Sequence, residues 1–172
     1  VKSGVMLIDQ RRAHERILYE RMLNALENQQ PLAQQSLFPE TVTLNAADYQ
    51  VCLEMIVPME QLGFDIRDFG NNSVVVHGFP SDIKPVGAAD TLELMIEQYK
   101  TLEGLNNTQH AERISRAAAK ASAIRYGKQL SDIEMQELID QLFACENPKQ
   151  TPSGSLIVKI IDLEELDAHF KD

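Results

Sequence analysis

The amino-acid sequence predicts an α+β fold, because strand patterns, helix patterns and a hairpin follow one another along the chain. A short apolar run, Val5 to Ile8, is followed directly by apolar residues at helical spacing. Residues 64–69 alternate apolar and polar, and turn residues separate them from a second apolar run at 74–76, which predicts a hairpin. Near the other end, Ser131 and Glu134 have the spacing of a capping box at the start of a helix.

Length and composition favour a cytoplasmic globular protein. The 172 residues suit one domain, or one domain with an inserted subdomain, and 44% hydrophobic residues are enough for a sizeable core. The chain begins with Val and contains no apolar run approaching about 18 residues. We therefore expect a fragment of a longer soluble chain, with no signal peptide and no contact with a membrane.

Charge and cysteine content argue against two classes of function. Sixteen basic and twenty-six acidic side chains give a formal net charge of −10, which opposes DNA binding by the surface as a whole. Cys52 and Cys145 lack C-x-x-C spacing and lie in apolar helical contexts. They are expected to be buried free thiols rather than a disulfide or a zinc site.

The first half of the chain predicts a strand and helix followed by a small α+β subdomain. Val5 to Ile8 is expected to be buried on both faces, and Asp9 is placed to cap the helix that follows. After Pro31 the pattern predicts, in order, an interrupted strand, a helix containing Pro58, the hairpin, a loop and another helix. Their ranges are 36–44, 46–62, 64–76, 79–87 and 88–99.

The second half predicts a linker at 104–107, a long helix from about 108 to 126, and the capped helix from Ser131 to Asn147-Pro148. A loop at 151–154, a buried strand at 156–161 and a short helix at 163–170 follow. Arg113, Arg116 and Lys120 form a basic stripe on the long helix. The stripe is either a solvated or ion-paired face, or a patch that guides DNA or a partner.

Asp9-Gln10 and the following residues 13–20, AHERILYE, resemble the motif that opens the C-terminal domain of MutL mismatch-repair proteins. Members with endonuclease activity read D-Q-H-A-x-x-E-x-x-x-x-E. Asp9, Glu15 and Glu20 match this pattern, whereas Arg11 and Arg12 stand in place of its His and Ala. The metal-binding imidazole is therefore missing.

A second match lies at residues 123–148, which resemble the family's A-I-x-x-G-x-x-L-S-x-x-E-M pattern and its continuation to N-P. The resemblance implies a dimerisation subdomain, residues 1–33 and 108–172, and an inserted external α+β subdomain, residues 34–107. Lys120, Thr151 and Ser153 occupy positions where nicking members carry Cys and His ligands. We therefore expect no metal, no cofactor and no nuclease activity in this domain. The alternative is a nicking endonuclease that holds Mg²⁺ or Mn²⁺ through Asp9, Glu15 and Glu20.

Residues 34–39, QQSLFP, resemble the Q-x-[SD]-L-F peptides that dock on the sliding clamp of DNA polymerase. The Gln34 amide would supply directional hydrogen bonds, Leu37 and Phe38 would be apolar anchors, and Pro39 would limit further pairing. The alternative is an ordinary strand whose Leu37 and Phe38 pack inward.

The resemblance also implies the partners of the whole protein. They are a second copy of the chain, the clamp and other mismatch-repair proteins, with DNA bound weakly or through an absent N-terminal ATPase half, and with association with the nucleoid during repair. A further strand is implied upstream of Val5, and the dimer is expected to bury more than about 1,000 Å² of the end-of-chain subdomain. At the former metal site, at least one of Arg11, Arg12 and Lys120 is expected to pair with Asp9 or Glu15.

Overall fold

The structure, a computed structural model, describes residues 4–81, 83, 87–102 and 110–170. Helices and strands are both present, which confirms the predicted α+β class. The chain divides into two compact units: residues up to 17 together with those from 124 onward form the terminal unit, and residues 18–123 form the inserted unit. The assignment of residues 1–33 and 108–172 to dimerisation, and of 34–107 to an external subdomain, stays a prediction.

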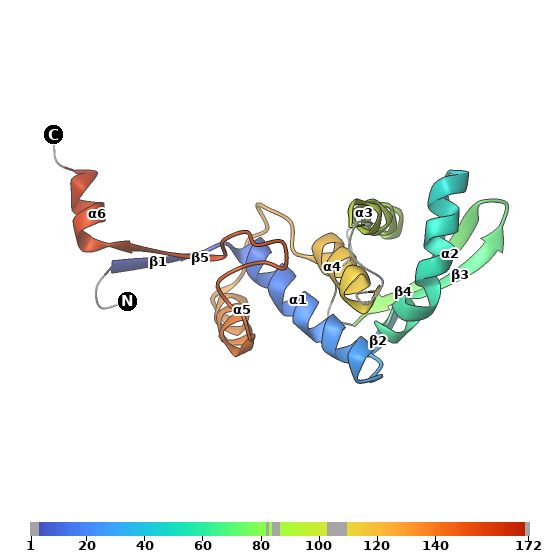
Figure 1. Ribbon diagram of the computed structural model, residues 1–172, viewed down its shortest axis with the longest axis horizontal. Coiled ribbons are helices and arrows are strands. Elements are labelled where there is room, and N and C mark those ends of the chain that lie inside the picture. The colour runs from blue at the N-terminus through green and yellow to red at the C-terminus, as the bar shows by residue number, and fades with distance from the viewer. Residues whose placement is uncertain (1–3, 82, 84–86, 103–109, 171–172) are drawn as a thin grey trace. The chain divides into compact units, whose positions relative to one another are not determined.

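The terminal unit is built around a two-stranded antiparallel ribbon. Strand β1 (Gly4–Ile8) pairs with β5 (Val158–Asp162), so that Gly4 lies opposite Asp162 and Ile8 lies opposite Val158. The first part of α1 (Gln10–Glu27), together with α5 (Asp132–Ala144) and α6 (Leu163–Ala168), completes the unit (Figure 1). Its small core contains Ala13, Ile17, Leu142 and Ile157.

The expectation that the first strand is buried on both faces is wrong for this chain by itself. Val5 and Leu7 are 42% and 49% exposed, and Ile160 on β5 is 56% exposed. The predicted buried strand at 156–161 begins only at Val158 and is largely exposed as well. The reason is that, among the described residues, the ribbon consists of these two strands alone and the small core reaches only the end near Ile8 and Val158.

The inserted unit packs helices against a three-stranded antiparallel sheet. Its strands are β2 (Gln34–Thr43), β3 (Asp65–Gly70) and β4 (Ser73–Pro80), in the order β2-β4-β3. Its helices are the second part of α1, α2 (Ala46–Gln61), α3 (Ala88–Thr101) and α4 (His110–Ser122). The core is large and includes Met55, Met59 and an edge-to-face pair of Phe64 and Phe79 with ring centroids 5.4 Å apart.

Local sequence signals account for several element boundaries. Gly63, with φ +83°, ends α2 in a Schellman motif, in which Phe64 N–H donates to Met59 O and Gly63 N–H donates to Glu60 O. Asn71 and Asn72 both have positive φ, as the tight turn of the β3–β4 hairpin requires. The capping box at Ser131 and Glu134 is present, which confirms the predicted start of α5.

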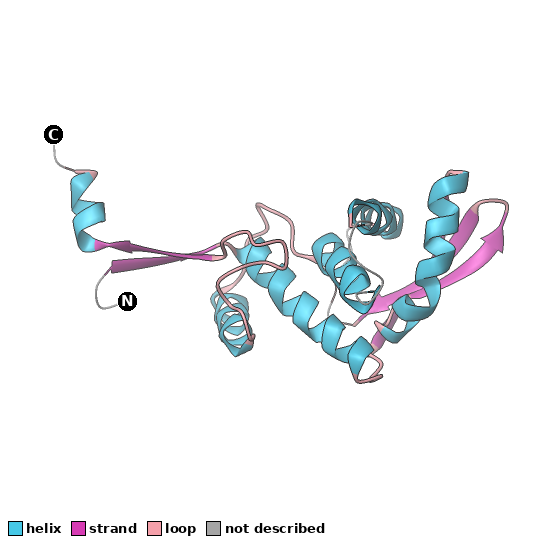
Figure 2. Ribbon diagram, in the orientation of Figure 1, coloured by secondary structure: helices cyan, strands magenta, loops and turns pink. Residues whose placement is uncertain are grey.

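Figure 2 shows the helices and strands, and several of their ends differ from the predicted ranges. Strand β4 extends through Pro80, so residues 79–80 are strand rather than loop. Helices α4, α5 and α6 end at Ser122, Ala144 and Ala168, earlier than predicted, because apolar spacing marks a helix face but not its last turn. The expected linker at 104–107 lies outside the described residues.

The two cysteines differ in burial, and neither forms a disulfide. Cys52 is fully buried and free, and burial raises the pKa of its thiol to about 11. Cys145 forms no disulfide but is only partly buried, so the expectation of burial is wrong for it.

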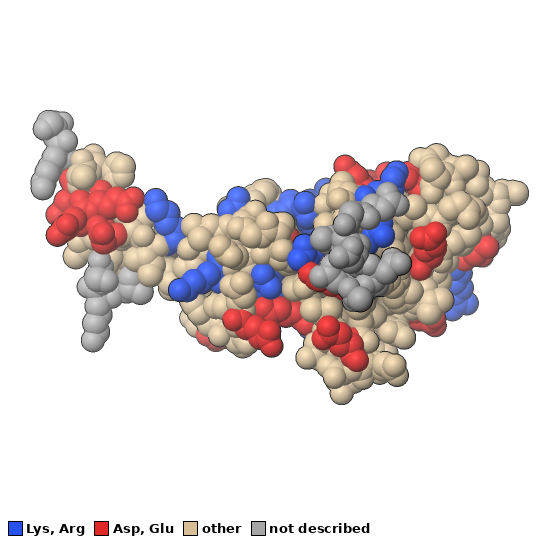
Figure 3. All heavy atoms as spheres, in the orientation of Figure 1, with Lys and Arg blue, Asp and Glu red and all other residues tan. Residues whose placement is uncertain are grey.

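Acidic side chains gather over α6, whose first turn carries Glu164 and Glu165 (Figure 3). No helix in the described ranges is both long and apolar enough to cross a membrane.

Candidate functional site

The junction between β1 and α1 is held by Asp9. Its backbone N–H donates to the Ile157 carbonyl at 3.0 Å, and its Oδ1 accepts the backbone N–H of Arg12 at 3.0 Å. The carboxylate therefore satisfies one of the backbone donors that every helix leaves open at its start. This confirms the capping role predicted for Asp9.

Arg12 pairs with the same carboxylate. Its Nε lies 3.4 Å from Asp9 Oδ2, and its Nη1 donates to the Leu156 carbonyl at 2.7 Å. The Tyr126 hydroxyl donates to Asp9 Oδ2 at 3.4 Å. The expectation that at least one of three basic residues pairs with Asp9 or Glu15 is thereby confirmed, and both carboxylate oxygens of Asp9 have partners in the chain.

Other side chains at the start of α1 bind the segments that follow α4 and α5. The Arg11 guanidinium lies 5.1 Å from the centre of the Tyr126 ring, within range of a cation–π contact. Gln10 Nε2 donates to the Lys128 carbonyl at 2.7 Å, and the buried Arg16 donates from Nε to the Gln150 carbonyl at 2.7 Å. These three side chains therefore have structural partners within the terminal unit.

The loop that follows α5 satisfies its own polar groups. The hydroxyls of Thr151 and Ser153 lie 3.0 Å apart, and Ser155 N–H donates to Thr151 Oγ1 at 3.0 Å. Thr151 is buried, with its backbone N–H donating to the Ser155 carbonyl. Neutral hydroxyls that already bond within a closed turn are poor substitutes for thiolate or imidazole ligands.

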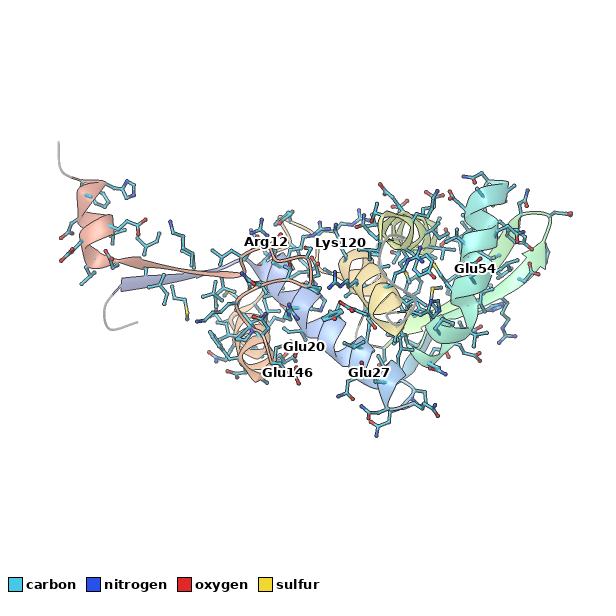
Figure 4. The ribbon with its side chains drawn as sticks, in the orientation of Figure 1. Arg12, Glu20, Glu27, Glu54, Lys120 and Glu146 are labelled. Carbon is cyan, nitrogen blue, oxygen red and sulfur yellow. The ribbon has the colours of Figure 1, made fainter. Side chains whose placement is uncertain are left out.

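The other residues of the expected metal motif are spread out. Glu15 is buried on α1 near Asp9 in sequence, whereas Glu20 lies five residues further on, about 140° around the helix axis. Figure 4 shows Glu20 well along α1 from Arg12. Lys120 lies on α4 in the inserted unit. In the part of the chain that the structure describes, no three His, Cys, Asp or Glu side chains form a group that could hold a metal ion.

The expected clamp segment lies on edge strand β2, where the pairing with β4 is irregular. Ser36 lies opposite Gly78, but Glu40 lies opposite Val76, so residues 37–39 face one residue of β4 and bulge from the strand. Phe38 is 98% exposed, which shows that the alternative of an inward-packed Phe38 is wrong. The Gln34 side chain is exposed and lies against Gly78.

The basic stripe on α4 has partners for two of its three members. The Arg113 guanidinium lies 3.6 Å from the centre of the Tyr99 ring, and its Nε donates to the Tyr99 carbonyl at 2.9 Å. Arg116 pairs with Glu112 one turn away on the same helix. The solvated or ion-paired interpretation therefore describes Arg113 and Arg116 better than a free cationic patch does.

Exposed apolar side chains concentrate in the terminal unit. Some of them lie on the two strands that the sequence predicts to be buried. Of thirteen large exposed hydrophobic residues among those described, ten lie in this unit. They are Val5, Leu7, Tyr126, Ile133, Met135, Phe143, Leu156, Ile160, Leu163 and Phe170. On α5, the sequence indicates this exposure, because apolar residues occur on more than one side of the helix and cannot all face one core. Large exposed apolar side chains are therefore more numerous in the terminal unit than among the described residues of the inserted unit.

These features define an association domain of the α+β class, in which the two ends of the chain pair in one ribbon and carry most of the exposed apolar surface. Sequence comparison names the family: residues 1–130 match the model of the MutL C terminal dimerisation domain, and the chain belongs to that family.

Relatives described as DNA mismatch repair protein MutL match almost the whole chain. Those of Chlorobium chlorochromatii and Chloroherpeton thalassium are 38% and 39% identical over 170 residues, 99% of this chain. The protein of Chlorobaculum tepidum is 36% identical over the same length. The matched region is 26–27% of each relative, so the chain spans about a quarter of their length.

Proposed function

We propose that this domain forms a homodimer through the β1–β5 ribbon, as the partner-binding part of a mismatch-repair protein. The observation that carries the proposal is that both faces of the ribbon carry apolar side chains, of which Val5, Leu7 and Ile160 are exposed. Val5 lies opposite Ile161, and Met6 lies opposite Ile160. Opposed residues share a face in an antiparallel pair, so each face presents apolar side chains.

Energetics favour a covered ribbon. An isolated two-stranded ribbon is marginally stable in water, and burial of apolar surface contributes about 25 cal/mol per Å². A second copy of the chain could cover these side chains. The run Val5 to Ile8 would then be buried on both faces, as its sequence pattern predicts. We expect the buried area to exceed the roughly 1,000 Å² of a specific interface.

The test compares two exposed apolar positions on different strands. Leu7→Asp places a charge on the ribbon, and Phe69→Asp is the matched control, because Phe69 is exposed on β3 of the inserted unit. Light scattering after size exclusion should show a monomer for Leu7→Asp and a dimer for Phe69→Asp. A dimer that survives Leu7→Asp and dissociates with Phe69→Asp would place the interface on the inserted unit.

The same proposal assigns no catalysis, metal or cofactor to this domain. The support is chemical: Asp9 is engaged by Arg12 and by the start of α1, and Thr151 and Ser153 bond to one another. For the whole protein, we assign nucleotide binding to an N-terminal ATPase half, contacts with other repair proteins to the full-length chain, this domain included, and DNA binding to weak contacts or to the ATPase half.

A second function, docking on the sliding clamp of DNA polymerase, is favoured by Phe38. A phenylalanine that is 98% exposed at a bulge of an edge strand contributes nothing to the core and is free to enter a pocket on a partner. Its neighbours in the segment, Gln34 and Pro39, are exposed residues as well.

A pull-down with the purified clamp tests this function. Phe38→Ala combined with Gln34→Ala should reduce clamp binding at least about tenfold, as expected on loss of an aromatic anchor. Phe69→Ala, which truncates another exposed aromatic side chain of the inserted unit, should leave clamp binding unchanged. Unchanged binding by the Phe38→Ala, Gln34→Ala variant, with an intact fold, would overturn the assignment.

A further inference from the structure

Gly78 leaves room for the side chain of Gln34. A Cβ atom added at Gly78 would lie 2.7 Å from Gln34 Nε2 and 3.3 Å from Gln34 Cγ. The Gln34 side chain therefore occupies the space above Gly78 and extends from edge strand β2 over the central strand β4. Its amide group therefore lies over the sheet, next to Gly78, and does not extend outward from the edge of β2.

Asp65 lies on the far side of the same glycine. Ser36 on β2 and Asp65 on β3 both pair with Gly78, from opposite sides. Paired residues share a face of an antiparallel sheet, so Asp65 lies on the face that a side chain at Gly78 would occupy, and the Gln34 side chain fills that space. Gln34 and Asp65 therefore approach each other over one glycine in the middle strand.

The Asp65 carboxylate is held in place and ionised. Arg67 donates from Nε and Nη2 to its two oxygens at 2.9 and 3.0 Å. These bonds are the main cause that lowers the pKa of Asp65 below its ordinary value, and a hydrogen bond from the Gln34 side chain lowers the pKa further. At neutral pH, Asp65 is thus a charged acceptor for the Gln34 amide.

We propose that Asp65 acts as a latch that holds the Gln34 side chain over Gly78, so that clamp docking must first release it. The inference rests on the proposed clamp function. Phe38 is already exposed for docking, whereas the amide donors of Gln34 are engaged within the sheet. The free energy needed to break the Gln34–Asp65 contact makes the binding free energy of the segment for the clamp less favourable.

The experiment measures the dissociation constant for the purified clamp by calorimetry. Asp65→Ala should tighten binding about three- to tenfold, the range expected when one hydrogen bond to a partly buried charged group no longer has to be broken. Glu54→Ala is the control, because it removes the same charge from an exposed position on α2 (Figure 4). It should leave the affinity unchanged, and Asp65→Ala should have no effect in a Gln34→Ala background.

Two outcomes separate the latch from the clamp function. If Phe38→Ala weakens binding but Asp65→Ala leaves it unchanged or weaker, the latch is wrong and clamp docking stands. If binding does not respond to Phe38→Ala, both proposals fail. A third measurement needs no clamp: the side-chain amide resonances of Gln34 in the free protein should shift on Asp65→Ala, and unmoved resonances would overturn the latch.

Discussion

Arg12 Nε lies 3.4 Å from Asp9 Oδ2, and the two residues flank the first turn of α1. The carboxylate that would bind a metal ion in a nicking enzyme is instead used as a helix cap with a fixed positive charge beside it. Such a partly exposed ion pair contributes about 0–1 kcal/mol to the free energy of unfolding. Its main consequence is that both oxygens of Asp9 are already engaged.

Replacement of Asp9 should separate the cap from the ion pair. Asp9→Ala removes both and should lower the free energy of unfolding by about 1–2 kcal/mol. Asp9→Asn keeps a capping oxygen and should cost less than about 1 kcal/mol. Urea unfolding of the three proteins measures the difference, and equal losses for the two variants would show that the cap contributes nothing.

Plasmid nicking should be absent. Supercoiled plasmid incubated with the domain and Mn²⁺ should give no more nicked circles than buffer alone, because Asp9 is already engaged by Arg12 and no three His, Cys, Asp or Glu side chains among the described residues form a group that could hold the ion. Glu15→Ala is the control and should behave as the unmodified protein does. Reproducible nicking that Glu15→Ala abolishes would establish the endonuclease alternative.

Stability of the inserted unit should fall in acid. Hydrogen bonds from Lys100, Arg67 and Tyr49 respectively lower the pKa values of Asp48, Asp65 and Asp68 below the ordinary 3.8. Each carboxylate releases its proton more readily when folded, so its stabilisation is complete above about pH 5 and is lost as the pH falls through the lowered pKa.

Thermal unfolding between pH 2 and 7 checks this dependence. The melting temperature should be insensitive to these groups above pH 5 and should drop below pH 4. Asp65→Asn should make the drop shallower. If the melting temperature of this variant falls as steeply below pH 4 as that of the unmodified protein, Asp65 does not contribute to the pH dependence of stability.

The sequence predicted most elements because their signals are local. The capping box at Ser131, the glycine at 63 and the asparagine turn at 71–72 each satisfy backbone groups within a few residues. The expected capping by Asp9 followed from the same kind of short-range pattern. The α+β class follows from these elements together.

The exposure of side chains could not be predicted in the same way. The apolar run Val5 to Ile8 has the composition of a doubly buried strand, and composition cannot say whether burial comes from the same chain or from a second copy. Phe38 is a similar case, because a bulge between Ser36 and Glu40 exposes it and depends on the register with β4. The approach of Gln34 to Asp65 also depends on three strands meeting at Gly78.

Sedimentation equilibrium of the unmodified domain at micromolar concentration measures directly whether the domain is a dimer. We expect a dimer, with twice the 19.4 kDa mass of one chain. A species of 19.4 kDa throughout that concentration range would contradict dimerisation through the β1–β5 ribbon.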